Sequence, residues 1–388
     1  MTIKEAGRES ALPKVIPERI REAREARGLS TDVFGEMIGV SRQAVAQYET
    51  GQIGPSAEVL SRIIAVTGQP PTFFVSPRRR KADSSSTPFW RSLKRMEQTE
   101  RARITRRIEW AADIVDYVEE FIELPAVDLP DMQWNAEDSS DEDIEEIALR
   151  VRADWGLGYG PIHDLAPILE GHGVILMREK VNCKDMDAVS RWQTGRPFIL
   201  YSAEVNSQPR VNFNLAHELG HLILHGGSEV NSDNLPRLER QANRFAGALL
   251  MPRSTFPKEV ISTSIKYFET LKVRWRVSIA AMIYRCKDLA ILSETQVKYL
   301  WRQMNVLGIR QIEPLDDAFE VASPGILRAS LEMLVSNKVQ TRESIERSIN
   351  LSAADIESLG GTNAGWLSAD KVVAFTPRPF LREKRDIA

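Results

Sequence analysis

The stretch NLAHELGHLILH, residues 214–225, contains three of the five histidines of this 388-residue chain. Its apolar residues recur at helical spacing, so the side chains of His217 and His221, four residues apart, lie on one face of the expected helix. Two imidazoles placed in this way can bind one metal ion. Glu218, about 100° around the helix from His217, can reach a water beside that ion as a general base. The stretch therefore predicts a metal site, and the alternative is a pair of histidines that only fill an apolar core.

Two histidines leave a catalytic zinc site incomplete, because such a site has three protein ligands and a water. His225 extends the same face but lies about 12 Å along the helix from His217, too far for both to bind one ion through bonds of about 2.1 Å. A third ligand must come from another element. The best source is the helical run LERQANRFAGALLMP at 238–252, whose Glu on an adjacent antiparallel helix would complete a His₂Glu set. Less favoured ligands, interpreted as surface charge, are Glu204, Glu229 and Asp233.

The composition is typical of a soluble globular protein, with 43% hydrophobic and 27% charged residues. No stretch approaches the about 18 uninterrupted apolar residues of a membrane helix, and the first residues lack an apolar signal core. We therefore expect a cytoplasmic protein with no membrane partner. Cys183 and Cys286 fit no paired metal or redox spacing and are expected to be core thiols in a reducing compartment.

The net charge of −3 hides a difference between the two ends of the chain. Residues 1–110 carry 20 Lys or Arg and 13 Asp or Glu, whereas the remaining residues carry 31 and 41. A basic front end indicates contact with a polyanion, although charge alone fits a basic surface without a partner equally well.

The pattern of helices, strands and linkers predicts a multidomain protein. Strands are expected at 173–179, 187–193 and 197–203, directly before the histidine helix, with helices on either side of this group. A long helix is expected from residue 90 to about 123. The predicted parts are an all-α N-terminal domain at 1–76; a basic linker, the long helix and an acidic connector at 77–140; an α+β domain at 141–312; and a C-terminal accessory helical region at 313–388, whose default role is packing or dimerisation.

Residues 16–75 alternate short amphipathic segments with turn signals. Ser30 is expected to cap a helix over residues 31–38, Gly39 to turn the chain, and Ser41 to cap the next helix. Two short helices around a tight glycine turn are typical of a helix-turn-helix, whose second helix enters the major groove. Arg on that helix can bond to guanine and Gln to adenine, and a small Ala allows close approach. The alternative is a plain helical bundle with polar caps.

The order of residues resembles the XRE or Cro/C1-type helix-turn-helix of phage repressors, over about 60 residues that include the run Arg24…Gly28-Leu29-Ser30…Gly39-Val40-Ser41…Tyr48-Glu49-x-Gly51. In that family the positions of Arg24 and Glu49 form an ion pair that braces the first helix against the recognition helix. The family usually has Gln where this chain has Thr31, and a small Ala where it has Gly35, which should loosen that helix slightly. The resemblance implies binding to a double-stranded DNA operator, with a homodimer expected because one module reads a short half-site. The predicted DNA contacts are Thr31, Ser41, Arg42, Gln43, Ala44 and Gln47.

HELGH resembles the ImmA/IrrE family of metallopeptidases when it is taken together with Glu239-x-x-Ala242-Asn243-x-Phe245-Ala246-x-x-Leu249-Leu250-Met251-Pro252. The similarity covers roughly residues 145–310 and includes DAVS at 187–190, where the family often has Asp-Ala-Phe-Ser. It implies a zincin-like domain with a gluzincin-like His₂Glu site, in which the metal ligands are His217, His221 and Glu239 and the catalytic base is Glu218. Zn²⁺ is expected from the ligand types, with Mn²⁺ or iron as alternatives. Arg210 and Tyr201 are candidate contacts to the transition state or substrate.

Together the two resemblances imply a DNA-binding transcriptional regulator, a repressor, with its own zinc-dependent metalloendopeptidase domain. Peptidases of the ImmA/IrrE family are associated with cleavage of helix-turn-helix repressors, so the expected substrate is the chain itself or a partner regulator. The expected setting is stress, mobile-element or phage-defence control by a bacterial or phage-encoded protein that joins the nucleoid when it binds DNA. The alternative is a plain repressor whose metal domain is a catalytically weak sensor or assembly module.

Overall fold

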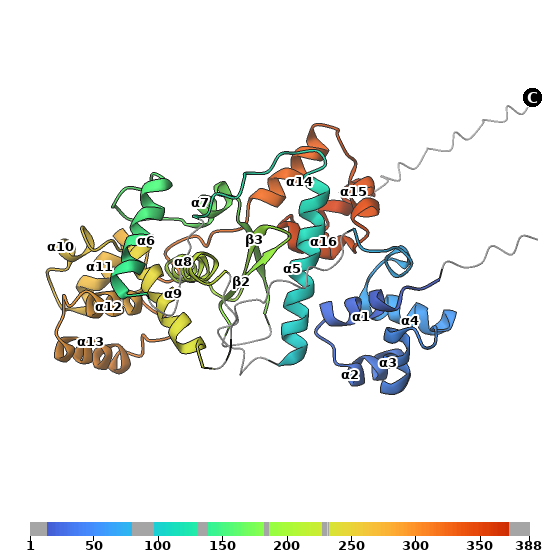
Figure 1. Cartoon of the computed structure of the whole chain (residues 1–388), viewed down its shortest axis with the longest axis horizontal. Helices are drawn as coiled ribbons and strands as arrows, with labels where there is room; N and C mark the ends of the chain where they lie inside the picture. Colours follow the sequence, from blue (N-terminus) through green and yellow to red (C-terminus); the bar gives the residue numbers. More distant parts are fainter. Residues whose placement is uncertain are drawn as a thin grey trace, which may run out of the picture.

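A computed structural model describes residues 14–79, 97–130, 139–181, 186–226, 231 and 233–371. The N-terminal helices lie at one end of the molecule, a small sheet lies near its centre, and a group of helices that follows the sheet in sequence lies at the other end (Figure 1). The C-terminal helices lie beside the sheet and the long helix α5. The architecture is therefore the predicted one, multidomain, with a helical N-terminal region, a mixed α/β domain and a helical C-terminal region. Among the described residues, no helix is long and apolar enough to span a membrane.

The N-terminal region is formed by five short helices: α1 (Pro17–Ala26), α2 (Thr31–Ile38), α3 (Arg42–Thr50), α4 (Ala57–Thr67) and the 3₁₀ turn η1 (Pro71–Phe74). Ser30 and Ser41 cap α2 and α3 as predicted, because their hydroxyls accept hydrogen bonds from the amides of Val33 and Ala44. The turn between them depends on Gly39, whose φ of 70° is left-handed. Sterics favour glycine at position 35 as well, because a Cβ there would lie 2.8 Å from the carbonyl oxygen of Val40.

The central sheet has three strands, β1 (Ile175–Glu179), β2 (Ala188–Gln193) and β3 (Arg196–Ser202), in the order β1-β3-β2. β1 is parallel to β3, and β2 is antiparallel to it. The two-residue turn between β2 and β3 has positive φ at both Thr194 (53°) and Gly195 (80°), which matches the twist of a tight hairpin.

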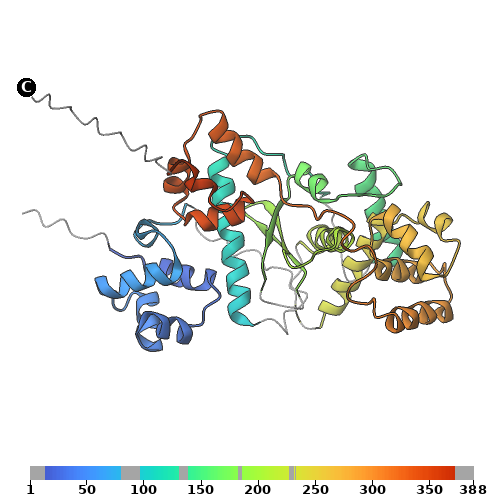
Figure 2. The same cartoon turned by 180° about the vertical axis from the view of Figure 1, so that it is seen from behind.

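Both faces of the sheet are covered, and alternate residues of each strand belong to different apolar clusters. In β3, Ile199 and Tyr201 pack in the cluster that contains helix α8 (Gln208–Leu224), whereas Phe198 and Leu200 pack in the cluster that contains helix α5 (Gln98–Val118). Figures 1 and 2 show α8 and α5 on opposite sides of the sheet. The sheet thus separates the two cores.

The helices around α8 form the rest of the mixed domain. They are α6 (Asp141–Asp154), α7 (Ala166–Gly171), α9 (Leu235–Leu250), α10 (Phe256–Glu259), α11 (Ile265–Trp275), α12 (Ile279–Asp288) and α13 (Glu294–Val306). α9 packs closely along α8 at Gly220, where a Cβ would lie 3.1 Å from Phe245 Cδ1 and 3.2 Å from Ala242 Cα. The glycine of HELGH therefore sets the spacing between the two helices. Cys286 on α12 is a buried free thiol, whereas Cys183 lies outside the described residues.

The C-terminal helices share their apolar core with α5 and with the sheet face that α5 covers. They are α14 (Ile326–Ser336), α15 (Arg342–Ile349), α16 (Ala353–Gly360) and the 3₁₀ turn η2 (Trp366–Lys371). Leu331, Ile345 and Ile356 belong to the same cluster as Ile108 of α5. α5 itself ends at Val118, before the predicted limit near 123, and residues 90–96 of the predicted helix lie outside the described residues.

A buried ionic cluster joins the N-terminal region to the rest of the molecule. Arg27, at the end of α1, donates hydrogen bonds of 2.8 and 2.7 Å to the two carboxylate oxygens of Asp355 on α16. Arg107 on α5 also bonds to Asp355 and bonds to Glu179 at the end of β1. Gln69, which follows α4, donates a further bond of 2.6 Å to Asp355. The cluster therefore connects five segments of the chain.

Candidate metal centre and DNA-binding face

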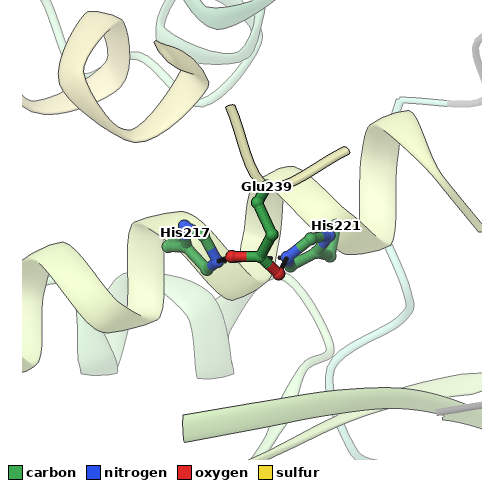
Figure 3. A group of neighbouring side chains, drawn as sticks. All are labelled: His217, His221 and Glu239. Atoms are coloured by element: carbon green, nitrogen blue, oxygen red, sulfur yellow. Dashed lines mark hydrogen bonds and ion pairs between the residues drawn. The ribbon is translucent and has the colours of Figure 1, made fainter. Parts of the chain in front are cut away.

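The histidine pair lies in the second half of α8, which begins with Gln208 and has Pro209 in its first turn, where proline is well tolerated. His217 and His221 are 4% and 2% exposed, and their Nε2 atoms are 3.0 Å apart. Figure 3 shows both imidazoles directed toward the carboxylate of Glu239. The helical spacing thus brings two ring nitrogens together at one buried point, as the motif predicts.

Glu239 comes from α9, the helix that packs along α8. Its Oε2 lies 3.5 Å from Nε2 of His217, and its Oε1 lies 3.4 Å from Nε2 of His221. Burial raises the pKa of this carboxyl, but hydrogen bonds and charge from the two imidazoles outweigh burial and hold its pKa well below the usual range. A group of this kind is ionised at neutral pH and is ready to act as an anionic ligand.

The three residues fit a tetrahedral metal ion. Ligand atoms bound at 2.0–2.2 Å in a tetrahedron lie about 3.4 Å apart, and each imidazole has one Glu239 oxygen near that distance, Oε2 for His217 and Oε1 for His221. The two Nε2 atoms are a few tenths of an ångström closer than that ideal. Among the described residues, these three form the one His, Cys, Asp or Glu group whose ligand atoms all lie within 4.8 Å of one another. Glu204 and Asp233 are exposed and outside this group, and Glu229 lies outside the described residues.

Each histidine of the pair has a partner on its other ring nitrogen. Nδ1 of His217 lies 3.0 Å from Oδ1 of Asn243, one turn after Glu239 on α9. Nδ1 of His221 lies 3.0 Å from Nδ1 of His225. His225 is therefore next to the site without being one of its three clustered ligands, and burial lowers its pKa to about 3.

Glu218 is 3% exposed and accepts a hydrogen bond of 2.6 Å at Oε2 from the hydroxyl of Ser190. Ser190 lies in the middle of β2 and is fully buried. Our reading of the sequence missed this residue, although the DAVS match at 187–190 contains it. A serine in an apolar strand was the available signal, because a buried hydroxyl requires a partner.

A cleft of about 560 Å³ lies beside the cluster, between α8, α9 and α12, and Glu239 forms part of its wall. Arg210 also lines it, although its guanidinium already contacts Asp187 at 3.5 Å and the carbonyl of Gln311 at 3.1 Å. Tyr201 does not line this cleft. It is 1% exposed, and its hydroxyl donates a bond of 2.7 Å to the carbonyl of Ala322. The structure thus brings Arg210, but not Tyr201, to the cleft beside Glu239.

The expected DNA-binding residues lie on and beside α3. Ser41, Arg42 and Gln43 are exposed at its N-terminus, whereas Ala44 and Gln47 are half-buried along it. Thr31 is half-buried at the start of α2. α2 and α3 lie at the lower edge of the N-terminal region in Figure 1, apart from the sheet.

The brace between α1 and α3 is present. Arg24 donates bonds of 2.6 and 2.9 Å to the two carboxylate oxygens of Glu49, and both residues are buried. A bidentate pair of this kind holds the end of α3 at a set position.

Comparison with known proteins separates two regions of the chain. Residues 20–74 match the family model described as helix-turn-helix, and residues 169–287 match the one described as the IrrE N-terminal-like domain of the M78 peptidases. A protein of Methanospirillum hungatei JF-1 is 50% identical over 46 residues, and one of Pyrococcus furiosus is 43% identical over 53 residues. Both are named as HTH-type transcriptional regulatory proteins. The first match covers 12% of this chain and 15% of the relative, and the second covers 14% and 17%.

One solved structure, ComR from S. thermophilus in complex with DNA and its signalling peptide ComS, aligns with 88% of this chain and 99% of its own length. Its sequence identity is 12% and its TM-score is 0.15, so this similarity has no bearing on the fold. The family models thus match two regions of the chain, an XRE-type helix-turn-helix at residues 20–74 and an IrrE/ImmA-like peptidase domain at residues 169–287.

Proposed function

We propose that the protein is a DNA-binding transcriptional repressor whose own metal-dependent endopeptidase domain relieves repression by cleaving this chain or a partner regulator. One observation carries the proposal: the cluster of His217, His221 and Glu239, next to the buried Glu218, belongs to the same chain as a helix-turn-helix with an exposed α3. Stress, mobile-element or phage-defence control is the proposed setting, in a cytoplasmic protein that joins the nucleoid when it binds DNA.

Operator binding is assigned to α3. The exposed side chains of Arg42 and Gln43 are of the types that bond to base edges in the major groove, and Gln47 lies one turn further along the helix. A homodimer follows from the short half-site that one module reads. Arg42 is within 3.4 Å of Asp32 in the free protein, an exposed pair that costs little to separate when a phosphate or base replaces the carboxylate.

The peptidase chemistry is assigned to the metal cluster, to Glu218 and to the cleft beside Glu239. The cluster of His217, His221 and Glu239 would hold Zn²⁺, with Mn²⁺ or iron as alternatives, and a bound ion would supply a Lewis acid for the peptide carbonyl. Glu218 accepts a proton from the attacking water and transfers it to the leaving amine, and the hydroxyl of Ser190 orients its carboxylate. The cleft beside Glu239 takes the substrate chain, with Arg210 as a cationic contact at its wall.

The decisive experiment compares the wild type with Glu218→Gln and with the control Glu204→Gln, which makes the same chemical change at an exposed carboxylate. Intact-mass analysis of the metal-loaded protein detects self-cleavage. Labelling of new N-termini in host cells that express each variant detects a partner substrate, and reporter expression from the operator measures derepression.

We expect cut products and derepression with the wild type and with Glu204→Gln, and neither with Glu218→Gln. If all three proteins bind the operator alike, derepress alike and leave the same N-termini, the peptidase assignment is wrong. The protein is then a plain repressor whose metal domain is a sensor or assembly module.

A further inference from the structure

Four arginines line the cleft beside the metal cluster, and three of them have acidic partners. Arg285 forms a bidentate pair with Glu145, and Arg244 donates a further bond of 2.8 Å to the same carboxylate. Arg210 lies 3.5 Å from Asp187. The charges of these three arginines are therefore already compensated within the protein.

The fourth arginine, Arg240, has no such partner. It is exposed, and no described residue forms a hydrogen bond or an ion pair with its guanidinium. A planar guanidinium offers five N–H donors, and two of them match the two oxygens of a carboxylate. Arg240 therefore presents an uncompensated cation to the cleft.

Arg240 lies beside the metal cluster. It directly follows Glu239 on α9, so the two Cα atoms are about 3.8 Å apart, and its side chain is turned by about 100° around the helix from that ligand. A carboxylate bound to Arg240 would therefore lie next to the cluster without taking the place of Glu239. In a peptide held in the cleft, this carboxylate belongs to a residue close to the bond that is cut.

The attraction for a carboxylate is limited to one part of the cleft wall. Arg244 lies on the same face of α9 as Arg240, about 6 Å further along the helix axis. Asp141 lies 3.5 Å from Arg244, and Asp288, whose carbonyl oxygen accepts a bond from Arg244, also lines the cleft. Together with Glu145 these acids leave no excess of positive charge at Arg244. The cleft is therefore built to attract one acidic side chain at Arg240 and not an acidic peptide along its whole length.

We propose that Arg240 is a specificity-determining residue that binds an Asp or Glu side chain of the substrate segment in this cleft. The inference rests on the proposed peptidase function, whose substrate chain occupies the same cleft. It adds a substrate class to that function, namely segments with an acidic residue at one fixed position near the bond that is cut. A basic residue at the same position is repelled by the guanidinium.

The first test measures peptide binding, which does not depend on cleavage. A random dodecapeptide library is presented to the full chain carrying Glu218→Gln, with an excess of nonspecific double-stranded DNA to occupy the basic N-terminal region. The tightest-binding peptides are resynthesised with each Asp or Glu replaced in turn by Asn or Gln. Each peptide is titrated against this protein and against versions that also carry Arg240→Gln or Arg253→Gln. Arg253 is the matched control, because it is exposed and does not line the cleft.

One replacement in the peptide is expected to weaken binding about 10-fold with the parent protein and with Arg253→Gln, and to have no effect with Arg240→Gln. Such a dependence of one substitution on the other is typical of two groups in direct contact. Arg240→Glu should bind the same peptide more tightly when Lys stands at that position. If the effect of no replacement depends on Arg240, the inference is wrong.

Cleavage of the same library by the wild type gives a second measurement. Mass spectrometry of the products is expected to show Asp or Glu at one fixed distance from the cut bond with the wild type, and not with Arg240→Gln. Cuts without an acidic preference overturn the inference and leave the peptidase proposal intact. Peptide binding that depends on Arg240, without cuts in the library or in host cells, supports the inference about the cleft and overturns the peptidase proposal.

Discussion

Removal of the Arg107 guanidinium tests how strongly the buried ionic cluster holds α5 to the sheet and to α16. Arg107 is 6% exposed, and its partners Glu179 and Asp355 are 5% and 4% exposed. Its Nε lies 2.8 Å from Oε2 of Glu179, within a bidentate pair. We consider Arg107→Met, which keeps most of the apolar stem and removes the charge.

The expected cost follows from what each carboxylate retains. Asp355 keeps the two bonds from Arg27 and the 2.6 Å bond from Gln69, so its charge remains compensated. Glu179 keeps the 2.9 Å bond from the hydroxyl of Ser358 but loses its positive partner. A buried charge left in this state typically costs about 3–5 kcal/mol, and we expect a loss of unfolding free energy of that size.

The assay is urea denaturation of the full chain at pH 7, followed by fluorescence of tryptophan, including the buried Trp110 of α5. The double variant Arg107→Met with Glu179→Gln removes the uncompensated charge and should recover more than half of the loss. The expected loss of unfolding free energy for a broken buried pair is about 3–5 kcal/mol. A loss below about 1 kcal/mol for Arg107→Met, at an unchanged denaturant slope, would refute the reasoning.

Acid should weaken the same cluster. Burial raises the pKa of Asp355, but Arg27 and Arg107 outweigh burial and hold its pKa below the usual range. The folded pKa is lower than the unfolded value of about 3.9, so the stabilisation is complete above about pH 4 and is lost as the pH falls further. Asp355→Asn should therefore flatten the acid limb of the stability curve, and an unaltered limb would contradict the assignment.

Three further predictions concern the two functional regions. Gln43→Ala and Gln47→Ala should each reduce discrimination between operator bases by about 1–3 kcal/mol, measured by binding to operators with single base changes. An unchanged base preference in both variants would show that α3 is not the helix that reads the operator. Gly220→Ala should push α9 away from α8, lower the free energy of unfolding by about 1–3 kcal/mol and weaken Zn²⁺ binding. Wild-type values in both a thermal melt and a chelator titration would contradict the close approach of α8 and α9. Ser190→Ala removes a bond to the carboxylate of Glu218 that is worth about 1.5–3 kcal/mol, and peptidase turnover should fall about 10–100-fold while Zn²⁺ affinity stays constant. Equal turnover in Ser190→Ala and the wild type would remove the role assigned to that hydroxyl.

Signals from neighbouring residues in the sequence were sufficient to predict much of the fold. The cap residues Ser30 and Ser41 and the turn at Gly39 mark α2 and α3, because capping and left-handed turns depend on neighbouring residues alone. The three strands lie where short runs of β-branched and aromatic residues predict them. The start of α7 (Ala166–Gly171) is also marked by a local signal. Pro167 in its first turn favours a start there over one further upstream.

Such local signals do not predict polar contacts between residues that are far apart in the sequence. Arg27 and Asp355 are 328 positions apart, and each occurs in a stretch whose charges look like those of a solvated helix face. Gln241 is equally ordinary in sequence, and its contact with the buried ring of His225 requires that α9 packs along α8. Residues such as these acquire a role only after the helices have packed, because their partners come from other elements.

The sheet that separates the two cores also limits how this chain can vary. Val189 packs in the cluster that contains α5, whereas the next residue, Ser190, bonds to the base candidate Glu218 on α8. A deletion or insertion of one residue within β2 would exchange these faces, placing polar groups in one core and removing the hydroxyl from the other. Changes of length in this strand should therefore be compatible with function only in steps of two residues.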